Sequence, residues 1–463
     1  MRMCRVIRPP GGEMNNKIRE IIDAGPMSRF QVLAVAICVG LNMLDGFDVL
    51  VMAFTGPAIS ADWGLKGAQL GVLLSAGLFG MAGGSLFLAP WADRFGRRAI
   101  ILLSLVIISV GMLLSAAAQN VAQLAALRVV TGIGIGGILA GISVITAEYA
   151  STKWRSNAIS LQVIGYPIGA TIGGSIAAIL ITQYGWRSAF LFGAIASVVM
   201  IPAVILHLPE SLDFLLVKQP PNALQRLNAL LRRMQHAEVA RMPEPPATER
   251  ELAQGNPLAG LFTSALARST LLIWISFFLL MFTFYFVLSW TPKLLVAAGL
   301  SPKQGITGGV LLNLGGIIGG GLFGYISSKM NLRKLTAAYF AIGAGMLVLF
   351  GLVASELTLA FVVALIMGAF IFGCMAGLYS LAPILYPTGV RTTGMGWAIG
   401  IGRIGAIVAP TLVGFLIDGG WKTSDLYYVC ALPLVAAMVT VLALGDRTAG
   451  SAIPSGAVAP GTR

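Results

Sequence analysis

Long apolar runs separate the charged residues of this chain. Ten runs contain no Asp, Glu, Lys or Arg, and they cover 67–92, 99–127, 129–147, 156–186, 188–209, 269–292, 304–328, 335–355, 357–390 and 426–445. Two further runs, about 30–57 and about 392–417, are interrupted only by Asp45 and Asp48 in the first and by Arg403 in the second. Because about 20 apolar residues cross a bilayer as an α-helix, the pattern predicts twelve transmembrane helices.

The composition excludes several classes of protein. Hydrophobic residues make up 57% of the 463 residues and charged residues 11%, whereas a soluble domain carries about 25% charged residues. A soluble enzyme, a disordered chain and a nucleic-acid reader are therefore poor fits, and the alternation of a membrane β-barrel is absent. Four cysteines and two histidines are scattered without metal-ligand spacing: Cys4, Cys38, Cys374, Cys430, His207 and His236. We expect no metal and no other cofactor.

The basic residues indicate the orientation in the membrane. With the N-terminus inside, most Lys and Arg fall in inside segments, and the outside loops hold only Lys66, Arg187, Lys293, Lys303 and Lys422. The positive-inside rule then places both termini in the cytoplasm. The net charge of +13 is read as a topology signal that matches anionic lipid, and not as a nucleic-acid site. Residues 1–29 are polar and lead into a run of full spanning length, so no cleavable signal peptide is expected.

One hydrophilic break divides the spans into six and six. The expected organisation is a cytoplasmic N-terminal segment at 1–29, a six-helix bundle at 30–207, a cytoplasmic central loop at 208–268, a second bundle at 269–445 and a cytoplasmic tail at 446–463. Within the break, 222–236 has helical spacing, and we expect it to lie on the membrane surface.

The two halves resemble each other at a nearly constant offset. Gly84-Ser85-Leu86-Phe87 corresponds to Gly320-Gly321-Leu322-Phe323, and Ile168-Gly169-Ala170 corresponds to Ile404-Gly405-Ala406, both at an offset of 236 residues. The predicted fold class is an all-α membrane protein with two six-helix pseudo-repeat halves. Such parallel repeats are typical of transporters, whose substrate site lies between the halves near the bilayer midplane.

The loop after the second span carries a family motif. Its residues 89–98, Ala-Pro-Trp-Ala-Asp-Arg-Phe-Gly-Arg-Arg, resemble the Gly-x-x-x-Asp-Arg-x-Gly-Arg-Arg motif of the major facilitator superfamily and depart from it at Ala89. Pro209-Glu210-Ser211 also resembles a motif of that family, and the second half keeps a basic residue at Arg391 without a matching acid. The resemblance implies a cytoplasmic gate built from Asp93, Arg94, Arg97, Arg98, Glu148, Arg155 and Arg391.

We expect Asp93 to meet a helix N-terminus, such as that of the eleventh span, and to form a latch with Glu148 and Arg155. This latch is expected to break when the inner side opens. The alternative is that these residues serve only as topology charges.

The first span narrows the resemblance. Asp45-Gly46-Phe47-Asp48, together with Arg128, Arg391 and Arg403, resembles the aromatic acid:H⁺ symporter branch. That branch imports aromatic carboxylates such as hydroxybenzoates, benzoate or gentisate together with protons. The implied partners are therefore a small organic anion, protons and the lipid bilayer of the cytoplasmic (inner) membrane, and the chain is expected to act as a monomer.

Two carboxylates lie in the first span, where charge is costly and usually functional. Asp45 and Asp48 are three residues apart and share one helix face. Their mutual repulsion and their burial both disfavour the charged form. We predict that one of them binds and releases the coupled proton. The alternative is that both line a wet vestibule or form a structural pair with Arg128.

Two arginines inside spans are candidate ligands of the substrate carboxylate. Arg403 falls near mid-membrane, and a guanidinium binds a carboxylate through two parallel hydrogen bonds. The alternative role for Arg403 is a structural ion pair. Arg128 reaches a depth similar to that of the aspartates, where it could stabilise a deprotonated aspartate or bind the substrate, and the sequence does not choose between these roles.

Aromatic residues in the spans could stack on a substrate ring. Tyr285 and Trp397 rank first because each also carries a polar group, and Phe47, Tyr166 and Tyr379 are further candidates. The alternative is ordinary packing, since aromatic residues are common in membrane spans.

One motif is misleading. The series Gly132-x-Gly134-x-x-Gly137 fits a dinucleotide fingerprint, but it lies inside an apolar span without a preceding strand. It is better interpreted as close helix packing, as is Gly315-x-x-x-Gly319.

The predicted function is proton-coupled import of an aromatic carboxylate by alternating access, without enzymatic activity. The alternatives are a facilitator-type carrier for a sugar, an aliphatic acid or drug export, and a nutrient sensor on a transporter fold. The sequence leaves open the exact substrate, the number of protons and the direction of transport.

Overall fold

Within the described residues, twelve helices are long and apolar enough to cross a membrane, and they make up most of the protein. The computed structural model describes residues 27–234, 236, 238–242, 261–263, 266–386 and 388–444, and these contain no β-strand. The helices of the first half are α2 (Arg29–Trp63), α3 (Gly67–Phe95), α4 (Arg97–Ala116), α5 (Val121–Tyr149), α6 (Thr152–Tyr184) and α7 (Arg187–His207). Those of the second half are α12 (Ala267–Ala297), α13 (Pro302–Ser327), α14 (Leu332–Val353), α15 (Leu357–Leu385), α16 (Thr388–Asp418) and α17 (Thr423–Leu442). The predicted number of spans and the all-α class are confirmed.

Polar residues at the helix starts set where several spans begin. The side chain of Ser28 accepts a hydrogen bond from the backbone N–H of Gln31, and Asn120 does the same for Gln123 at 2.9 Å. Ser301 and Asn331 cap α13 and α14 in the same way. Each cap satisfies a backbone N–H that has no partner within its helix.

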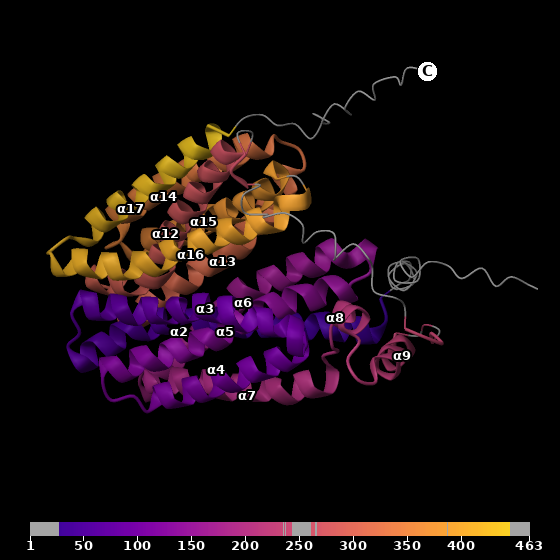
Figure 1. The fold of residues 1–463 in the computed structure, drawn as a ribbon. Helices are drawn as coiled ribbons and strands as arrows, with labels where there is room; N and C mark the ends of the chain where they lie inside the picture. The colour runs from indigo at the N-terminus through magenta and orange to yellow at the C-terminus, as the bar shows by residue number, and fades with distance from the viewer. Residues whose placement is uncertain are drawn as a thin grey trace, which may run out of the picture.

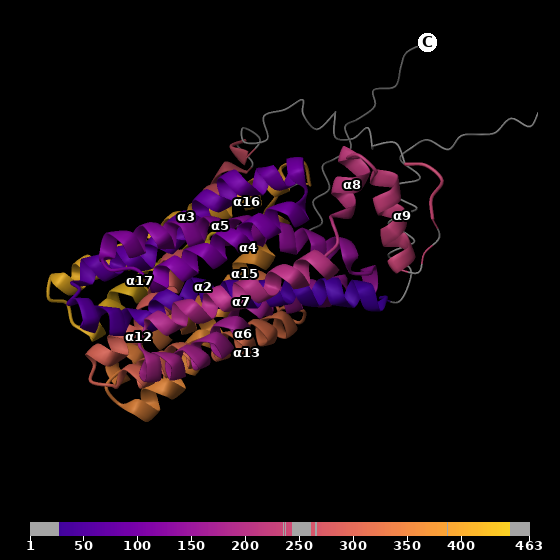
Figure 2. The same cartoon turned by 90° about the horizontal axis from the view of Figure 1, so that it is seen from below.

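The same pattern of helix pairs occurs in both halves. In the first half α2 packs on α6, α3 on α5 and α4 on α7, and in the second half α12 packs on α16, α13 on α15 and α14 on α17. Figure 1 shows the halves as two layers, and Figure 2 shows the first half from below. The prediction of two six-helix pseudo-repeat halves is therefore confirmed at the level of helix packing.

Glycines allow the paired helices to touch backbone to backbone. A Cβ atom on Gly132 of α5 would overlap the backbone carbonyl oxygen of Gly77 in α3. At the equivalent pair in the second half, a Cβ on Gly315 would overlap the carbonyl oxygen of Leu365. The glycine series that mimics a dinucleotide fingerprint is therefore a helix-packing surface, as expected.

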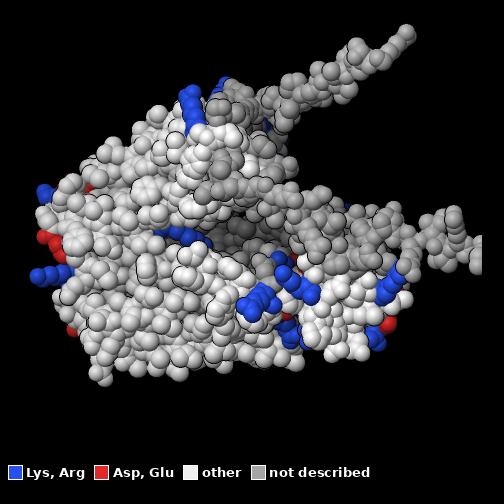
Figure 3. Space-filling view, viewed as in Figure 1, with Lys and Arg blue, Asp and Glu red and all other residues white. Residues whose placement is uncertain are grey.

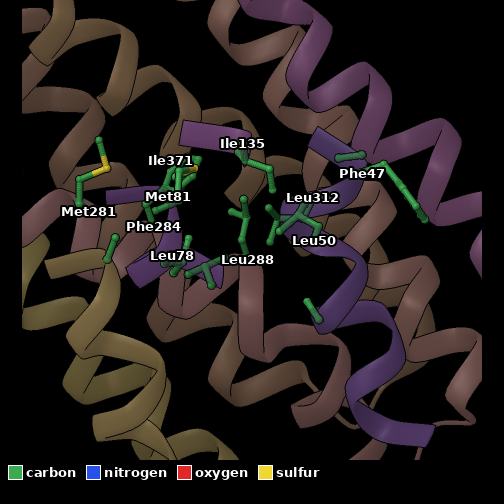
Figure 4. Packing of buried hydrophobic residues seen from close by; sticks show 14 of the residues in the cluster. Phe47, Leu50, Leu78, Met81, Ile135, Met281, Phe284, Leu288, Leu312 and Ile371 are labelled. Atoms are coloured by element: carbon green, nitrogen blue, oxygen red, sulfur yellow. The ribbon is translucent and has the colours of Figure 1, made fainter. Parts of the chain in front are cut away.

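One hydrophobic cluster runs through both halves. Leu50 of α2 and Leu78 of α3 lie close to Leu288 of α12 and Leu312 of α13, all of them buried (Figure 4). This apolar contact lies where the two halves meet, and it positions the polar residues described below.

At one end of the molecule the halves are tied together by hydrogen bonds. Asp418, the last residue of α16, accepts bonds from the backbone N–H groups of Gly67 at 2.6 Å and Ala68 at 2.9 Å, which begin α3. Further along the same pair of helices, Ser75 Oγ donates to the Ile407 carbonyl at 2.7 Å and lies 2.8 Å from Thr411 Oγ1. We call this the closed end.

At the opposite end the halves diverge. This end carries the short helices α8 (Leu212–Lys218) and α9 (Ala223–Arg233), and we call it the α8 end. The ribbon separates into its two layers toward α8 (Figure 1), and the space-filling view shows the molecule hollowed between the halves (Figure 3). The two halves are therefore in contact at the closed end and separated by a hollow toward the α8 end, as in a transporter that is open on one side.

The helix expected in 222–236 is present as α9, but its surroundings differ from the expectation. Leu227, Leu230 and Leu231 are buried within the protein, and the Arg233 guanidinium lies over the ring of Phe30, 5.6 Å from its centroid. The prediction that this segment lies on the membrane surface is therefore corrected. Its apolar residues pack on the protein's own helices, so they are not free to enter lipid.

Candidate functional site

The two aspartates of α2 are buried in the middle of the molecule. Asp48 is 0% exposed and Asp45 is 6% exposed. Both carboxylate oxygens of Asp48, and Oδ1 of Asp45, have no hydrogen-bond partner among the described residues. Buried carboxylates without partners are costly, which marks them as functional candidates.

Arg128 of α5 reaches α2 beside Asp48. Its Nη2 donates to the backbone carbonyl of Asp48 at 2.6 Å, and its Nη1 lies 3.4 Å from the sulfur of Met112. The side chain is 1% exposed, and its charge interacts with that of Asp48. Arg128 therefore belongs to the interior of the first half, where it offsets the charge of Asp48.

Asp45 instead faces the other half. Its charge interacts with that of Arg403 on α16, whose Nη1 is buried and has no hydrogen-bond partner among the described residues. The two aspartates, three residues apart, are thus associated with two different arginines. One pairing lies within the first half and the other joins the two halves.

Three tyrosine hydroxyls interact with the charges of Asp45 and Arg403. Tyr285 of α12 interacts electrostatically with both, and Tyr379 of α15 interacts with Arg403. Tyr166 of α6 interacts with Asp45 and with Tyr285. We call these five residues the central cluster. It draws on helices of both halves, as a site that changes its exposure when the halves move requires.

The chemistry of the central cluster suits an organic anion. A guanidinium binds a carboxylate through two parallel hydrogen bonds, and phenol rings offer faces for stacking and hydroxyls for polar contacts. Within the described part of the chain, no group of three or more His, Cys, Asp or Glu side chains could hold a metal ion.

Two aromatic candidates lie away from the central cluster. Phe47 is 3% exposed and packs edge-on against Phe192 inside the first half, with ring centroids 5.3 Å apart. Trp397 is 47% exposed and stacks on Trp274, with ring centroids 5.8 Å apart. It lies six residues before Arg403 on α16, which is about 9 Å nearer the α8 end and about 120° around the helix axis.

A second charged cluster ties α4 and α5 to the start of α8. Arg97 Nη1 lies 2.5 Å from Glu148 Oε1 and 2.5 Å from Ser211 Oγ. Ser211 Oγ also donates to Glu148 at 2.9 Å, and the backbone N–H of Leu212 donates to its other oxygen at 2.8 Å. We call Arg97, Glu148 and Ser211 the α8 clamp. All three lie in or directly after the first half.

The comparisons with known proteins agree with this architecture. The family model described as the Major Facilitator Superfamily matches residues 35–410. The chain belongs to this superfamily.

The similarity between this superfamily member and its relatives extends over nearly the whole length of both proteins. The chain is 33% identical to a protein named gallate transporter from Pseudomonas putida, over 92% of the chain and 95% of the relative. It is 31% identical to the 4-hydroxybenzoate transporter PcaK of Pseudomonas aeruginosa, with the same coverage. It is 27% identical to the benzoate transport protein of Acinetobacter baylyi, over 93% of each chain. These names fit the branch indicated by the signature at 45–48.

Solved structures of the superfamily share the fold. The inward-open xylose transporter XylE of E. coli superposes with a TM-score of 0.70 at 18% identity, over 90% of this chain and 97% of that one. A D-xylose-proton symporter superposes with a TM-score of 0.68 at 17% identity, over 89% of this chain and 97% of that one.

The structure describes contacts for some of the predicted gate residues in and around the loop between α3 and α4. The backbone N–H of Arg98 donates to Glu210 at 3.1 Å, and the Arg98 side chain donates to the Ile205 carbonyl. The Arg94 guanidinium lies over the ring of Phe95.

Two other predicted gate residues lie outside this loop. Arg391 donates to the Tyr386 carbonyl at 3.3 Å in its own half, and Arg155 is half-buried at the start of α6. The side chain of Asp93 lies outside the described set, so its expected contact with the start of α16 stays a prediction.

Some residues in these contacts were not among the sequence candidates. Glu210 and Ser211 belong to the quoted Pro209-Glu210-Ser211 motif, which was the available signal for them. The sequence did not indicate the role of Asp418, because a single acidic residue at the end of a span resembles an ordinary loop residue.

Proposed function

We propose that this protein is a proton-coupled transporter that brings an aromatic carboxylate into the cell by alternating access. The observation that carries the proposal is the central cluster, in which Asp45 and Arg403 from opposite halves interact and each keeps an unpartnered polar atom. Relatives named as gallate, 4-hydroxybenzoate and benzoate transporters support the class of substrate.

In the proposed mechanism Arg403 binds the substrate carboxylate and Tyr285 contacts the ring. A substrate carboxylate on Arg403 competes with Asp45 for the same guanidinium. Asp45 then loses the charge that favours its ionised form, and it takes up a proton. Substrate binding and proton binding are thereby linked through one guanidinium, which is the requirement of a symporter.

Charge balance then controls movement of the halves. With substrate and proton both bound, Arg403 is paired and Asp45 is neutral, so the central cluster carries no uncompensated charge. With both released, Asp45 and Arg403 neutralise each other. A state with only one of them bound leaves a buried charge without a partner, and such a state is costly inside a membrane. The halves therefore rock when the site is fully loaded or empty.

Asp48 and Arg128 have a supporting role in this proposal. Arg128 is held by the backbone of α2 within the first half, so it stabilises Asp48 and the shape of α2 beside the central cluster. Direct contact of Arg128 with the substrate is not part of the proposed mechanism, nor are contacts with Phe47 and Trp397.

The α8 end is assigned to the cytoplasm. This follows the distribution of Lys and Arg, and it makes the segments 1–29, 208–268 and 446–463 cytoplasmic. The hollow between the halves then faces inward, and the closed end faces outward. The α8 clamp, with Asp93, Arg94, Arg98, Arg155 and Arg391, is assigned to the cytoplasmic gate, and a single chain is the functional unit.

The test is uptake of labelled 4-hydroxybenzoate, benzoate and gallate into proteoliposomes, with and without an inward proton gradient. We expect gradient-driven accumulation of at least one acid, and loss of accumulation in Asp45→Asn and in Arg403→Ala. Glu356→Gln is the matched control, because Glu356 begins α15 without a side-chain cap bond and lies outside the central cluster. Accumulation of none of the three acids by the unmodified protein would contradict the proposal.

A further inference from the structure

Tyr166 is the tyrosine of the central cluster that belongs to the first half. On α6 it lies against α2, since a Cβ on Gly46 would overlap the Tyr166 carbonyl oxygen. Gly46 is the neighbour of Asp45 in the sequence. Gly174 lies eight residues further along α6. A Cβ atom added to it would lie 2.8 Å from the side chain of Phe54 in α2 and 2.8 Å from that of Val310 in α13. Gly174 is about 80° around the helix axis from Tyr166, and α6 packs on both α2 and α13, so α6 lies between α2 and the second half.

The hydroxyl of Tyr166 is buried and has no hydrogen-bond partner in the described part of the chain. Two other buried tyrosines differ from it. Tyr149 donates to the Glu210 carbonyl at 2.7 Å, and the Tyr427 hydroxyl lies 2.9 Å from Thr291 Oγ1. A buried hydroxyl without a partner destabilises a protein unless something else bonds to it. Its place in the central cluster indicates a ligand that supplies the missing partner.

The order of the cluster residues indicates which part of a ligand meets Tyr166. Arg403 acts electrostatically on Tyr285 and Tyr379, whereas the groups that act on Tyr166 are Tyr285 and Asp45. Tyr285 and Asp45 thus each neighbour both Arg403 and Tyr166. A ring with its carboxylate on Arg403 and its face toward Tyr285 directs its far edge toward Tyr166.

We propose that Tyr166 is a specificity-determining residue that hydrogen-bonds a hydroxyl group on the ring of the transported acid. The inference rests on the proposed function and deepens it, because it assigns the substrate to the hydroxylated aromatic acids. A phenol hydroxyl both donates and accepts, so it pairs with a ring hydroxyl in either sense. A site that has a hydrogen-bonding group for the hydroxyl discriminates against a ring without one.

The experiment compares two acids that differ only in the ring hydroxyl, 4-hydroxybenzoate and benzoate, in proteoliposomes with a fixed proton gradient. In Tyr166→Phe we expect the KM for 4-hydroxybenzoate to rise about tenfold, which corresponds to about 1.4 kcal/mol, with the KM for benzoate unchanged. Benzoate uptake also reports that the variant is folded. Tyr427→Phe is the matched control, because it removes a tyrosine hydroxyl from the second half away from the central cluster.

Three results would count against the assignment. Equal changes for both acids would mean that Tyr166 acts on packing alone. No change for either acid would mean that an ordered water, and not the substrate, bonds to the hydroxyl. Transport of neither these two acids nor gallate by the unmodified protein would overturn the proposed function and the inference with it, and this outcome is recognised before any variant is compared.

Discussion

Asp418 at the end of α16 caps the start of α3 in the other half, with its Oδ1 2.6 Å from the backbone nitrogen of Gly67. Oδ2 accepts a second bond from Ala68 at 2.9 Å. A carboxylate at a helix N-terminus is favourable both as a hydrogen-bond acceptor and as a charge. Here the cap and the capped helix belong to different halves, so the bond exists only while the closed end is closed.

Removing this cap is predicted to favour opening of the closed end. Asp418→Ala loses both acceptors and about 1 kcal/mol of the preference for the present state, a shift of several-fold in the population. The measurement is the labelling rate of a cysteine placed at Ser75, which lies in the seam between α3 and α16, by a maleimide added on the outer side. Asp425→Asn, an acid at the start of α17, is the control. An unchanged rate in Asp418→Ala would show that the cap does not hold this end.

Asp45 is predicted to couple the proton without being needed for movement of the halves. Asp45→Asn keeps a neutral side chain at the centre, which imitates the protonated carboxyl. We expect loss of gradient-driven accumulation, while exchange of labelled for unlabelled substrate across the membrane continues. Loss of exchange as well would assign Asp45 to substrate binding or folding, and a gradient response that survives would move the proton site to Asp48.

Arg128 is predicted to stabilise the first half through Asp48. Arg128→Met removes the hydrogen bond to the Asp48 carbonyl and the positive charge beside the Asp48 carboxylate, and loss of a hydrogen bond from a charged group costs about 1.5–3 kcal/mol. We expect a clear fall in the unfolding temperature in detergent. Addition of Asp48→Asn to the same chain should recover the part of the loss that comes from the uncompensated carboxylate, because no buried charge then remains. A double variant as unstable as the single one would refute this pairing.

The α8 clamp is predicted to hold α8 on the bundle. Arg97→Gln removes the ion pair to Glu148 and the bond to Ser211, so α8 should open more often. Hydrogen–deuterium exchange of residues 212–218 should become several-fold faster, while exchange in α14 stays unchanged. Equal protection in both proteins would indicate that the buried leucines of α8 hold it without the charges.

Much of the architecture could be predicted from local features of the sequence. The spans follow from runs such as 99–127, which no charge interrupts, and the two halves follow from the repeated offset of 236 residues. These features are local because a helix in lipid satisfies its own backbone and needs only an apolar surface. The packing role of Gly132 was predictable for the same reason.

The arrangement of the candidate site was less predictable. Asp45 and Asp48 share a helix face, but their arginines come from α16 and α5, and the sequence holds no information on which helix meets which aspartate. Phe47 and Trp397 could not be separated from Tyr285 because the rotation of a span about its axis depends on its neighbours. The central cluster became visible only when the helix packing was known.

The cap on α3 has a consequence for how this protein can be tuned by mutation. The donors at Gly67 and Ala68 are main-chain N–H groups, which every residue except proline supplies. Replacing side chains on that half leaves the donors in place, so genetic variation can adjust the contact chiefly through the single codon for Asp418. The part of the resting preference that comes from this cap can therefore change in one step, without disturbing the residues that recognise the cargo.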